Sequence, residues 1–260
     1  MIRVDADRFR AGITDLFAGS GMDADKAAIV AEMLVEADLI GHSTHGSGLV
    51  EGYLDALASG ELNGRGTYEV VADRGACVTW RGNRLPGAWL VRRALDLACE
   101  RVPQFGVVTV AIGGSHHTGA LAAYLRPVTD RGFVAEICCS TTSAARMAPF
   151  GGTAPVLTPN PLAIGFPTGG DPILIDLSAS ITTTTLTRTL AAKGERYPEQ
   201  WALTANGEPT DDPREVTERG GTLMPLGGAH KGYKGFGLAQ HVDQQREAEA
   251  LVALVGAAER

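Results

Sequence analysis

The sequence predicts an α/β protein, an α+β arrangement built on a mixed sheet, and three observations support this fold class. Apolar residues recur at helical spacing between Ile29 and Ala37, in the segment that follows Asp23. The valine-containing apolar run 106–112 has the length and composition of a buried strand. Glycine supplies 33 of the 260 residues, well above its average share of about 7%, which predicts many tight turns or close backbone approaches.

The expected elements alternate between helices and strands along most of the chain. We expect helices at 5–18, 23–40, 49–58, 88–102 and 119–131, and strands at 68–72, 76–80, 106–112, 133–138 and 173–176. Asp23 is the predicted N-cap of the second helix. The turn-rich segment 197–228 contains Asn206-Gly207, a hairpin signal, and is expected to wrap the surface.

Composition and charge exclude several classes of protein. A net charge of -7 without a Lys/Arg run disfavours nucleic-acid binding. The longest apolar stretches, such as Phe105–Ile112, are too short to span a bilayer, and the N-terminus has no apolar signal core, so we expect no membrane association and a cytoplasmic location. Cys77, Cys99, Cys138 and Cys139 lack a CxxC spacing and are expected to be reduced.

The segment Gly41–Gly46 carries the first candidate chemistry. Thr44 and His45 place a hydroxyl beside an imidazole just past a predicted helix C-terminus, where the helix dipole favours the protonated ring. This arrangement suits a general acid. For an isolated pair, a loop histidine that only caps the helix is the favoured alternative, by roughly two to one.

The glycine-rich segment 113–119 carries two further histidines, His116 and His117. It is expected to connect a buried strand to a helix N-terminus, whose free N–H groups attract an anionic ligand and disfavour positive charge on His117. On this reasoning His45 is the better acid. The alternative is an ordinary loop in which Ser115 or Thr118 caps the helix, and alone it is about as probable.

Two later segments suit the walls of a ligand pocket. Prolines fix the loop around Asn160, and Asp176 ends a predicted strand ahead of small residues. Lys231 and Lys234 lie among glycines in the segment 227–239, where the backbone could approach a pyrophosphate. The segment is not a Walker A loop, because GxxxxGK[ST] is absent.

Seven motifs in order resemble signatures of the malate/L-lactate/ureidoglycolate dehydrogenase family, which also includes sulfolactate and 2,3-diketogulonate enzymes and cyclic ketimine-2-carboxylate reductases. They are THGSGLVEGY, GSHHTGALAAY, APFGG, TPNPLAIGFP, IDLSAS, WALTANGEPTDDP and KGFGLA, and the resemblance spans about residues 8–243. It implies a non-Rossmann nicotinamide-binding fold, consistent with the lack of a GxGxxG turn after a first strand. It also implies a homodimer that uses NAD or NADP and acts on a small-molecule substrate.

The resemblance implies a division of the chain and roles for particular residues. A helical substrate and dimerisation part spans 1–70, joined by 236–260, and a nicotinamide-binding α/β part spans 71–235. Catalytic roles fall on His45, Thr44, His117 and Asp176, and substrate binding on Tyr53, His116 and Asn160. The cofactor-lining positions are His117, Ser140, Thr141, Asn160, Asp176, Ser178, Lys234 and Gly235. No metal is implied.

The chain departs from the family pattern at several positions. Gly48-Leu49 stands where most members have an arginine that clamps the substrate carboxylate. Thr158-Pro159 replaces Gly-Thr, and Thr185-Leu186 replaces Gly-Lys, with Arg188 the nearest cation. The resemblance ends after Asp243, and the chain is shorter than family members by roughly a quarter.

The leading hypothesis is therefore an oxidoreductase that transfers a hydride between a nicotinamide and a small 2-oxo acid, 2-hydroxy acid or cyclic imine carboxylate, with His45 as general acid/base. An alternative is that the scaffold serves a non-redox acid/base reaction, because Leu49 replaces the clamping arginine. A metal site built from His42, His45, His116 and His117 is a third possibility, at roughly one in twenty.

Overall fold

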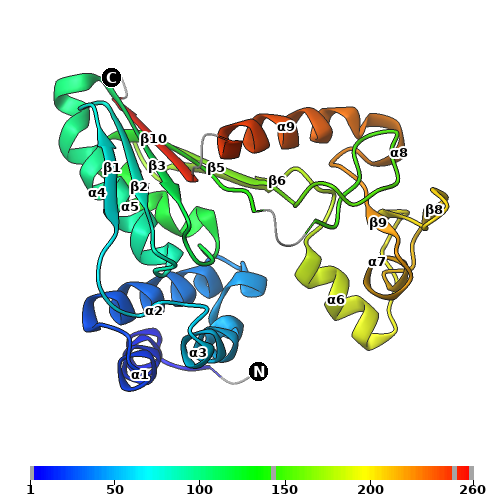
Figure 1. Cartoon of the computed structure of the whole chain (residues 1–260), viewed down its shortest axis with the longest axis horizontal. Coiled ribbons are helices and arrows are strands. Elements are labelled where there is room, and N and C mark those ends of the chain that lie inside the picture. The colour runs from blue at the N-terminus through cyan, green and yellow to red at the C-terminus, as the bar shows by residue number, and fades with distance from the viewer. Residues whose placement is uncertain (1–2, 142–144, 248–250, 258–260) are drawn as a thin grey trace. The chain divides into compact units, whose positions relative to one another are not determined.

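The computed structural model describes residues 3–141, 145–247 and 251–257 (Figure 1). The chain divides into two compact units. Unit 1 comprises Met1–Ile137, Ala163–Ile175 and Glu249–Arg260, and unit 2 comprises Cys138–Leu162 and Asp176–Ala248. We describe each unit by itself. Among the described residues, no helix combines the length and the apolar character needed to cross a lipid bilayer.

Unit 1 begins with packed helices, as the periodicity predicts. They are α1 (Ala6–Gly19), α2 (Ala24–Leu39) and α3 (Val50–Ser59), with the short 3-10 turns η1 (Ser43–His45) and η2 (Ser47–Leu49) between the last two. The Asp5 carboxylate caps α1 by accepting from the Arg8 N–H at 2.9 Å. Asp23 is the N-cap residue of α2, as predicted, but its carboxylate makes no capping hydrogen bond: it instead binds Lys26 Nζ at 2.9 Å and accepts from the Gly66 N–H at 3.1 Å.

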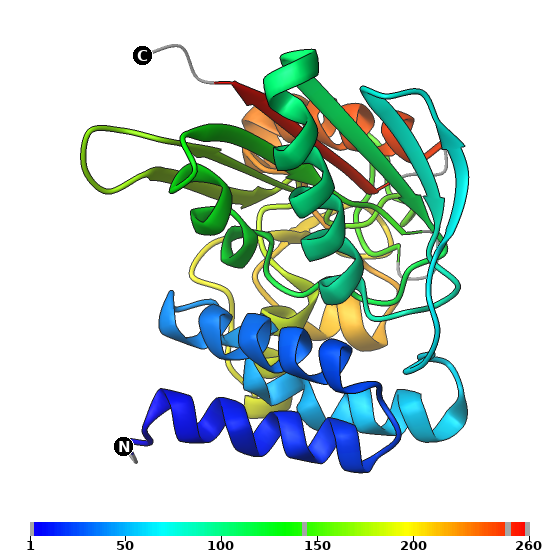
Figure 2. The same ribbon diagram turned by 90° about the vertical axis from the view of Figure 1, so that its left-hand side faces the viewer.

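A seven-stranded mixed sheet confirms the predicted fold class. Its order is β1-β2-β3-β10-β4-β5-β6. The strands are β1 (Glu69–Asp73), β2 (Cys77–Arg81), β3 (Val107–Gly113), β4 (Phe133–Cys138), β5 (Pro161–Phe166), β6 (Ile173–Ser178) and β10 (Leu251–Ala257). β1 pairs antiparallel with β2, β2 parallel with β3, and β3 antiparallel with β10. The long helix α4 (Gly87–Phe105) connects β2 to β3 (Figure 2).

One predicted helix is wrong. The segment 119–131 forms only the 3-10 turn η3 (Leu121–Tyr124) and the single turn α5 (Arg126–Thr129). Pro127 explains the interruption, because it has no N–H to donate to the carbonyl four residues earlier. Two strands of the large sheet, β5 and β10, were not predicted, and β10, from the C-terminal segment, lies between β3 and β4.

Unit 2 contains a small antiparallel sheet and several helices. The sheet has the order β8-β7-β9, with β7 (Ala202–Leu203), β8 (Pro209–Thr210) and β9 (Thr222–Leu223); the helices are α6 (Thr184–Lys193), α7 (Arg214–Glu218), α8 (Gly228–Lys231) and α9 (Tyr233–Glu247). The hairpin at Asn206-Gly207 is confirmed, with Gly207 at φ 86°. The expectation that 197–228 only wraps the surface is wrong, because Ala202 and Leu223 are fully buried in this unit's core.

The family resemblance divides the chain into a substrate and dimerisation part and a nicotinamide-binding part. This division by function stays a prediction. The two ends of the predicted joining segment 236–260 lie in different units, since α9 belongs to unit 2 and β10 to the sheet that includes β1–β4.

Core packing in α1 yields a stability prediction. Phe17 is fully buried and its ring centroid lies 6.4 Å from that of Tyr53. Phe17→Ala should lower the free energy of unfolding by about 3–5 kcal/mol through lost burial and a residual cavity. Leu16→Ala is the matched control, because Leu16 is 53% exposed, and should change it by no more than about 0.5 kcal/mol. Urea denaturation measures both, and equal effects would contradict the packing described.

Candidate active site

The first predicted histidine lies at the end of η1, in a turn held by Asp38. The Asp38 carboxylate accepts from the Ser47 N–H at 2.9 Å. A Cβ added at Gly46 would lie 1.9 Å from Asp38 Oδ1, so a side chain directly after His45 would displace the Asp38 carboxylate. The turn therefore has a defined path from α2 to α3.

His45 is oriented by its neighbour in the sequence. Thr44 Oγ1 lies 3.0 Å from His45 Nδ1, and both side chains are partly buried. This hydrogen bond leaves Nε2 as the ring nitrogen that Thr44 does not engage. The predicted pairing of hydroxyl and imidazole is present in the structure.

The glycine-rich turn 113–119 is docked onto the segment before α4 and not onto a helix N-terminus. Backbone hydrogen bonds run from Gly82 N to Gly113 O (2.7 Å), from Arg84 N to Gly114 O (2.7 Å) and from His116 N to Leu85 O (3.0 Å). The expected helix after the turn is reduced to η3, which begins at Leu121 without a side-chain cap. The predicted anion site at a helix N-terminus, and the capping roles of Ser115 and Thr118, are therefore wrong.

Gly87 makes this docking possible, and sequence reasoning missed it. It is the first residue of α4, and a Cβ there would lie 2.3 Å from His116 O and 2.6 Å from His117 O. The histidine backbone thus occupies the space that a side chain at Gly87 would need. Nothing in the local pattern around residue 87 reveals this contact, because its partner lies 30 residues away in the sequence.

The two histidine segments meet within unit 1. The rings of His45 and His117 stack with centroids 5.7 Å apart and an interplanar angle of 21°. Tyr53, from the buried face of α3, places its hydroxyl 2.6 Å from His117 Nδ1. Its ring also lies edge-on to His116, with centroids 5.4 Å apart. Four residues that the family resemblance singled out, Thr44, His45, Tyr53 and His117, therefore form one cluster.

The electrostatics of the cluster favour neutral rings at positions 116 and 117. Desolvation, followed by the charges that His45 and His116 would carry, lowers the pKa of His117 to about 4. His117 nevertheless keeps a solvent-exposed surface. Burial lowers the pKa of His116 as well. Neither change needs the helix dipole that the sequence suggested for His117.

His116 differs from His45 and His117 in the surroundings of its Nδ1 atom. Its Nδ1 atom is buried without a hydrogen bond to any described residue. An unsatisfied buried polar atom is costly and is common at sites where a ligand or water completes the bonding. This supports the expected place of His116 at the site.

The cofactor-lining residues predicted near Asn160 use their polar atoms within unit 2. Asn160 is fully buried at φ 43°, and its Oδ1 accepts from Ser140 Oγ at 3.0 Å and from Thr158 Oγ1. Its Nδ2 donates to Ala239 O at 3.0 Å and lies 3.4 Å from Asp243 Oδ1, which also accepts from Ser140 Oγ at 2.8 Å. This network ties the start of β5 to α9. Sequence reasoning did not select Asp243.

The remaining predicted cofactor positions show different surroundings. Ser178 Oγ donates to Ser180 O at 3.0 Å, whereas Thr141 and Lys234 are exposed. Asp176 is partly buried on β6. A Cβ at Gly235 would lie 2.4 Å from Leu226 N and 2.7 Å from Ala179 O. Packing of the unit's own backbone therefore accounts for this glycine, and the predicted approach of a pyrophosphate to the backbone is not needed to explain it.

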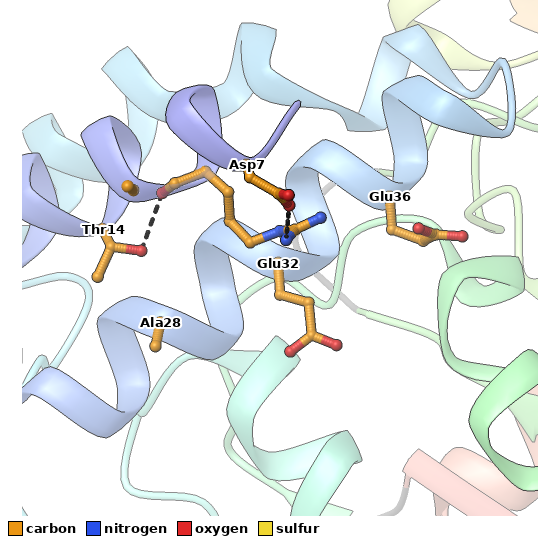
Figure 3. A pocket seen from close by; sticks show the side chains of 7 residues that line it. Asp7, Thr14, Ala28, Glu32 and Glu36 are labelled. Atoms are coloured by element: carbon orange, nitrogen blue, oxygen red, sulfur yellow. Dashed lines mark hydrogen bonds and ion pairs between the residues drawn. The ribbon is translucent and has the colours of Figure 1, made fainter. Parts of the chain in front are cut away.

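A pocket between α1 and α2 lies apart from the predicted residues. Figure 3 shows that it is lined by Asp7, Thr14, Ala28, Glu32 and Glu36. Arg10, which also lines it, already binds Asp7 at 2.8 Å. None of the residues selected from the sequence lines this pocket, so we do not assign it to the site. No group of three or more His, Cys, Asp or Glu side chains in the described ranges is arranged to hold a metal ion.

The contact at Gly87 can be tested directly. Gly87→Ala should displace the histidine turn and lower the free energy of unfolding by about 1–3 kcal/mol, the usual effect of overpacking. Gly52→Ala, on α3 with open space around the added Cβ, is the control and should be neutral or slightly stabilising. Thermal unfolding measures the change in stability of each variant, and the histidine side-chain NMR signals report whether the turn is displaced. A Gly87→Ala protein with wild-type histidine signals would show that the turn does not depend on this glycine.

Comparisons with known proteins place the chain among dehydrogenases. The family model described as malate/L-lactate dehydrogenase matches residues 4–244. The malate dehydrogenase of Pyrococcus abyssi is 31% identical over 93% of this chain and 67% of its own length, and the L-lactate dehydrogenase of Cupriavidus necator is 35% identical over 84% and 64%. The chain thus spans about two thirds of the length of these relatives.

Solved structures share the fold over nearly the whole chain. A dehydrogenase from Sinorhizobium meliloti superposes with a TM-score of 0.86 at 26% identity, covering 98% of this chain and 78% of that one. The delta1-piperideine-2-carboxylate reductase of Pseudomonas syringae gives a TM-score of 0.87 at 25% identity, with 98% and 81% covered. The match of the family model to residues 4–244 shows that this chain belongs to the malate/L-lactate dehydrogenase family.

Proposed function

We propose that the protein is an NAD- or NADP-dependent oxidoreductase that transfers a hydride between the nicotinamide and a small 2-oxo acid, 2-hydroxy acid or cyclic imine carboxylate. The observation that carries this proposal is the stacked pair of His45 and His117, each bonded through Nδ1 to a hydroxyl. Relatives named for malate, L-lactate and piperideine-carboxylate chemistry support the substrate class. The chain spans about two thirds of the length of these relatives, so the activity of the whole protein is a proposal.

In this proposal His45 is the general acid/base. The reduced nicotinamide, when bound, supplies a hydride to the carbonyl or imine carbon. His45 then donates one proton to the oxygen or nitrogen that gains negative charge, and takes it back in the oxidative direction. Thr44 orients the ring by its contact with Nδ1. Asp176 keeps its proposed catalytic role, as the family resemblance implies.

Unit 2 carries lysine side chains that could bind the phosphates of a dinucleotide. Lys231 and Lys234 are exposed, and neither forms an ion pair within the described part of the chain, so both can meet a diphosphate. Ser140, Asn160 and Ser178 keep their proposed places beside the cofactor, but their polar atoms already bind protein groups. We therefore propose that these three residues shape the pocket wall and that Lys234 contributes the charge.

The substrate is proposed to differ from common dicarboxylates. Leu49, on η2, supplies no guanidinium where most members clamp a carboxylate. A substrate with an unusual or differently held acid group fits this substitution. The same observation favours a second candidate, in which the scaffold keeps His45 and His117 as acid/base groups for a non-redox reaction.

Assembly and location remain proposals as well. We propose a cytoplasmic homodimer that uses the N-terminal helices. Phe9 and Leu16 of α1 are exposed apolar side chains, as are Leu39 at the end of α2 and Ile40 beside it. A two-fold contact that buries them would be self-complementary.

Cofactor binding is the experiment that tests the proposed function. A ligand that binds only the folded state should raise the melting temperature, by about 5 °C or more at one hundred times its Kd. Differential scanning fluorimetry with NADH and with NADPH measures this. Lys234→Ala should reduce the shift, whereas Lys193→Ala, an exposed lysine at the end of α6, should leave it unchanged. No shift with either cofactor would favour the non-redox candidate.

Substitutions of the two histidines separate their roles. His45→Ala should lower turnover by roughly 10²–10⁴-fold while cofactor binding stays nearly intact, because general acid catalysis typically contributes that much. His117→Ala should weaken cofactor or substrate binding together with turnover. Steady-state kinetics and cofactor titration measure both. If His45→Ala keeps near-wild-type turnover while His117→Ala loses turnover alone, the assigned roles are reversed.

A further inference from the structure

The geometry points to a positioning role for Tyr53: its buried hydroxyl donates to His117 Nδ1 and thereby keeps the ring as the neutral tautomer with its proton on Nε2. His117 then acts as a hydrogen-bond donor and not as a base. This inference deepens the proposed function and rests on it for its catalytic meaning. Its structural content can be tested without cofactor or substrate.

The hydroxyl of Tyr53 is buried and therefore needs a hydrogen-bond acceptor within the protein. Tyr53 is 7% exposed, and within the described residues its hydroxyl contacts one polar atom, His117 Nδ1, at 2.6 Å. The ring is held between Phe17, with centroids 6.4 Å apart, and His116, at 5.4 Å. Burial raises the pKa of Tyr53, so the phenol keeps its proton at neutral pH. A buried O–H without an acceptor is costly, and Nδ1 is the acceptor supplied.

This bond decides which nitrogen of His117 carries the proton. In a neutral imidazole one ring nitrogen is a donor and the other an acceptor. If Nδ1 accepts from the Tyr53 hydroxyl, the proton must lie on Nε2. Protonating Nδ1 as well would leave two donors facing each other and the phenol proton without a buried acceptor.

The other groups around His117 act in the same direction. The charged states of His45 and His116 both oppose a second proton on the ring, and no carboxylate contributes to its electrostatics in the described structure. Desolvation is the largest cause of the lowered pKa of His117 and acts in the same direction. A neutral ring with a fixed tautomer is therefore the state that all of its neighbours support.

The consequence is a division of labour between the stacked rings. The Nε2–H of His117 has no protein partner among the described residues, and the residue is exposed. It can donate to a carbonyl oxygen of a substrate or of the nicotinamide amide without transferring its proton. His45 keeps the proton-transfer step. Tyr53, expected from the family resemblance to contact the substrate, would act through His117 instead.

The test is ¹⁵N NMR of the histidine side chains in the full chain without cofactor or substrate. The His117 signals are assigned by their loss in His117→Gln. We expect a pyridine-like Nδ1 and a pyrrole-like Nε2 in the wild type. Tyr53→Phe keeps the ring but removes the donor, so it should yield a mixture of tautomers and raise the titration midpoint of His117 by about one pH unit.

Tyr124→Phe is the matched control. The Tyr124 hydroxyl is also buried and donates to Thr118 O, the residue after His117. Its removal perturbs the same turn but should leave the tautomer and the midpoint of His117 unchanged. A pyrrole-like Nδ1 in the wild type, or an unchanged His117 spectrum in Tyr53→Phe, would overturn the inference. Because no cofactor is present, these results are independent of whether the cofactor-binding experiment succeeds.

Discussion

The docking of the turn 113–119 against the start of α4 is the contact on which the candidate site depends. The turn has no regular secondary structure after Gly113, so its path is set by three backbone hydrogen bonds to residues 82, 84 and 85 and by the missing side chain of Gly87. This path brings His117 under the Tyr53 hydroxyl and against the ring of His45. A displaced turn would lose both contacts, although neither involves Gly87 directly.

Asn160 in unit 2 and His116 in unit 1 differ in how their buried polar atoms are satisfied. In unit 2, Asn160 engages both atoms of its amide with protein partners, which explains why a non-glycine residue is held at positive φ. In unit 1, His116 Nδ1 is left buried without a partner in the described structure. Full satisfaction rigidifies a framework, whereas a local deficit is typical of functional sites. The unpartnered Nδ1 of His116 lies in the cluster with Tyr53, His45 and His117, which supports this cluster as a source of reacting side chains.

Much of the fold could be predicted from the sequence, because its signals are local. The apolar spacing in α1, α2 and α4 and the Asn206-Gly207 turn depend on neighbours a few residues away. The incorrect or missing predictions have two causes, contacts between distant residues and prolines. Pro127 interrupts a run that otherwise has helical composition, and the prolines around β5 make its strand hard to recognise. The role of Gly87 depends on a contact 30 residues away. The proximity of His45 and His117 followed from the family resemblance alone, since spacing cannot reveal it.

The chemistry of the histidine pair follows from what each Nδ1 meets. Both rings are bonded there to a hydroxyl, but the two hydroxyls differ in freedom. Thr44 is partly exposed and next to His45 in the chain, so its hydroxyl can rotate to donate or to accept as the ring gains or loses a proton. Tyr53 is buried and retains its proton, so its bond suits only one state of His117. His45, which is proposed to exchange protons, needs a partner such as Thr44 that can donate or accept. His117, which is proposed only to donate a hydrogen bond, benefits from the fixed hydroxyl of Tyr53. The structure therefore distinguishes two histidines that the sequence presents as equivalent.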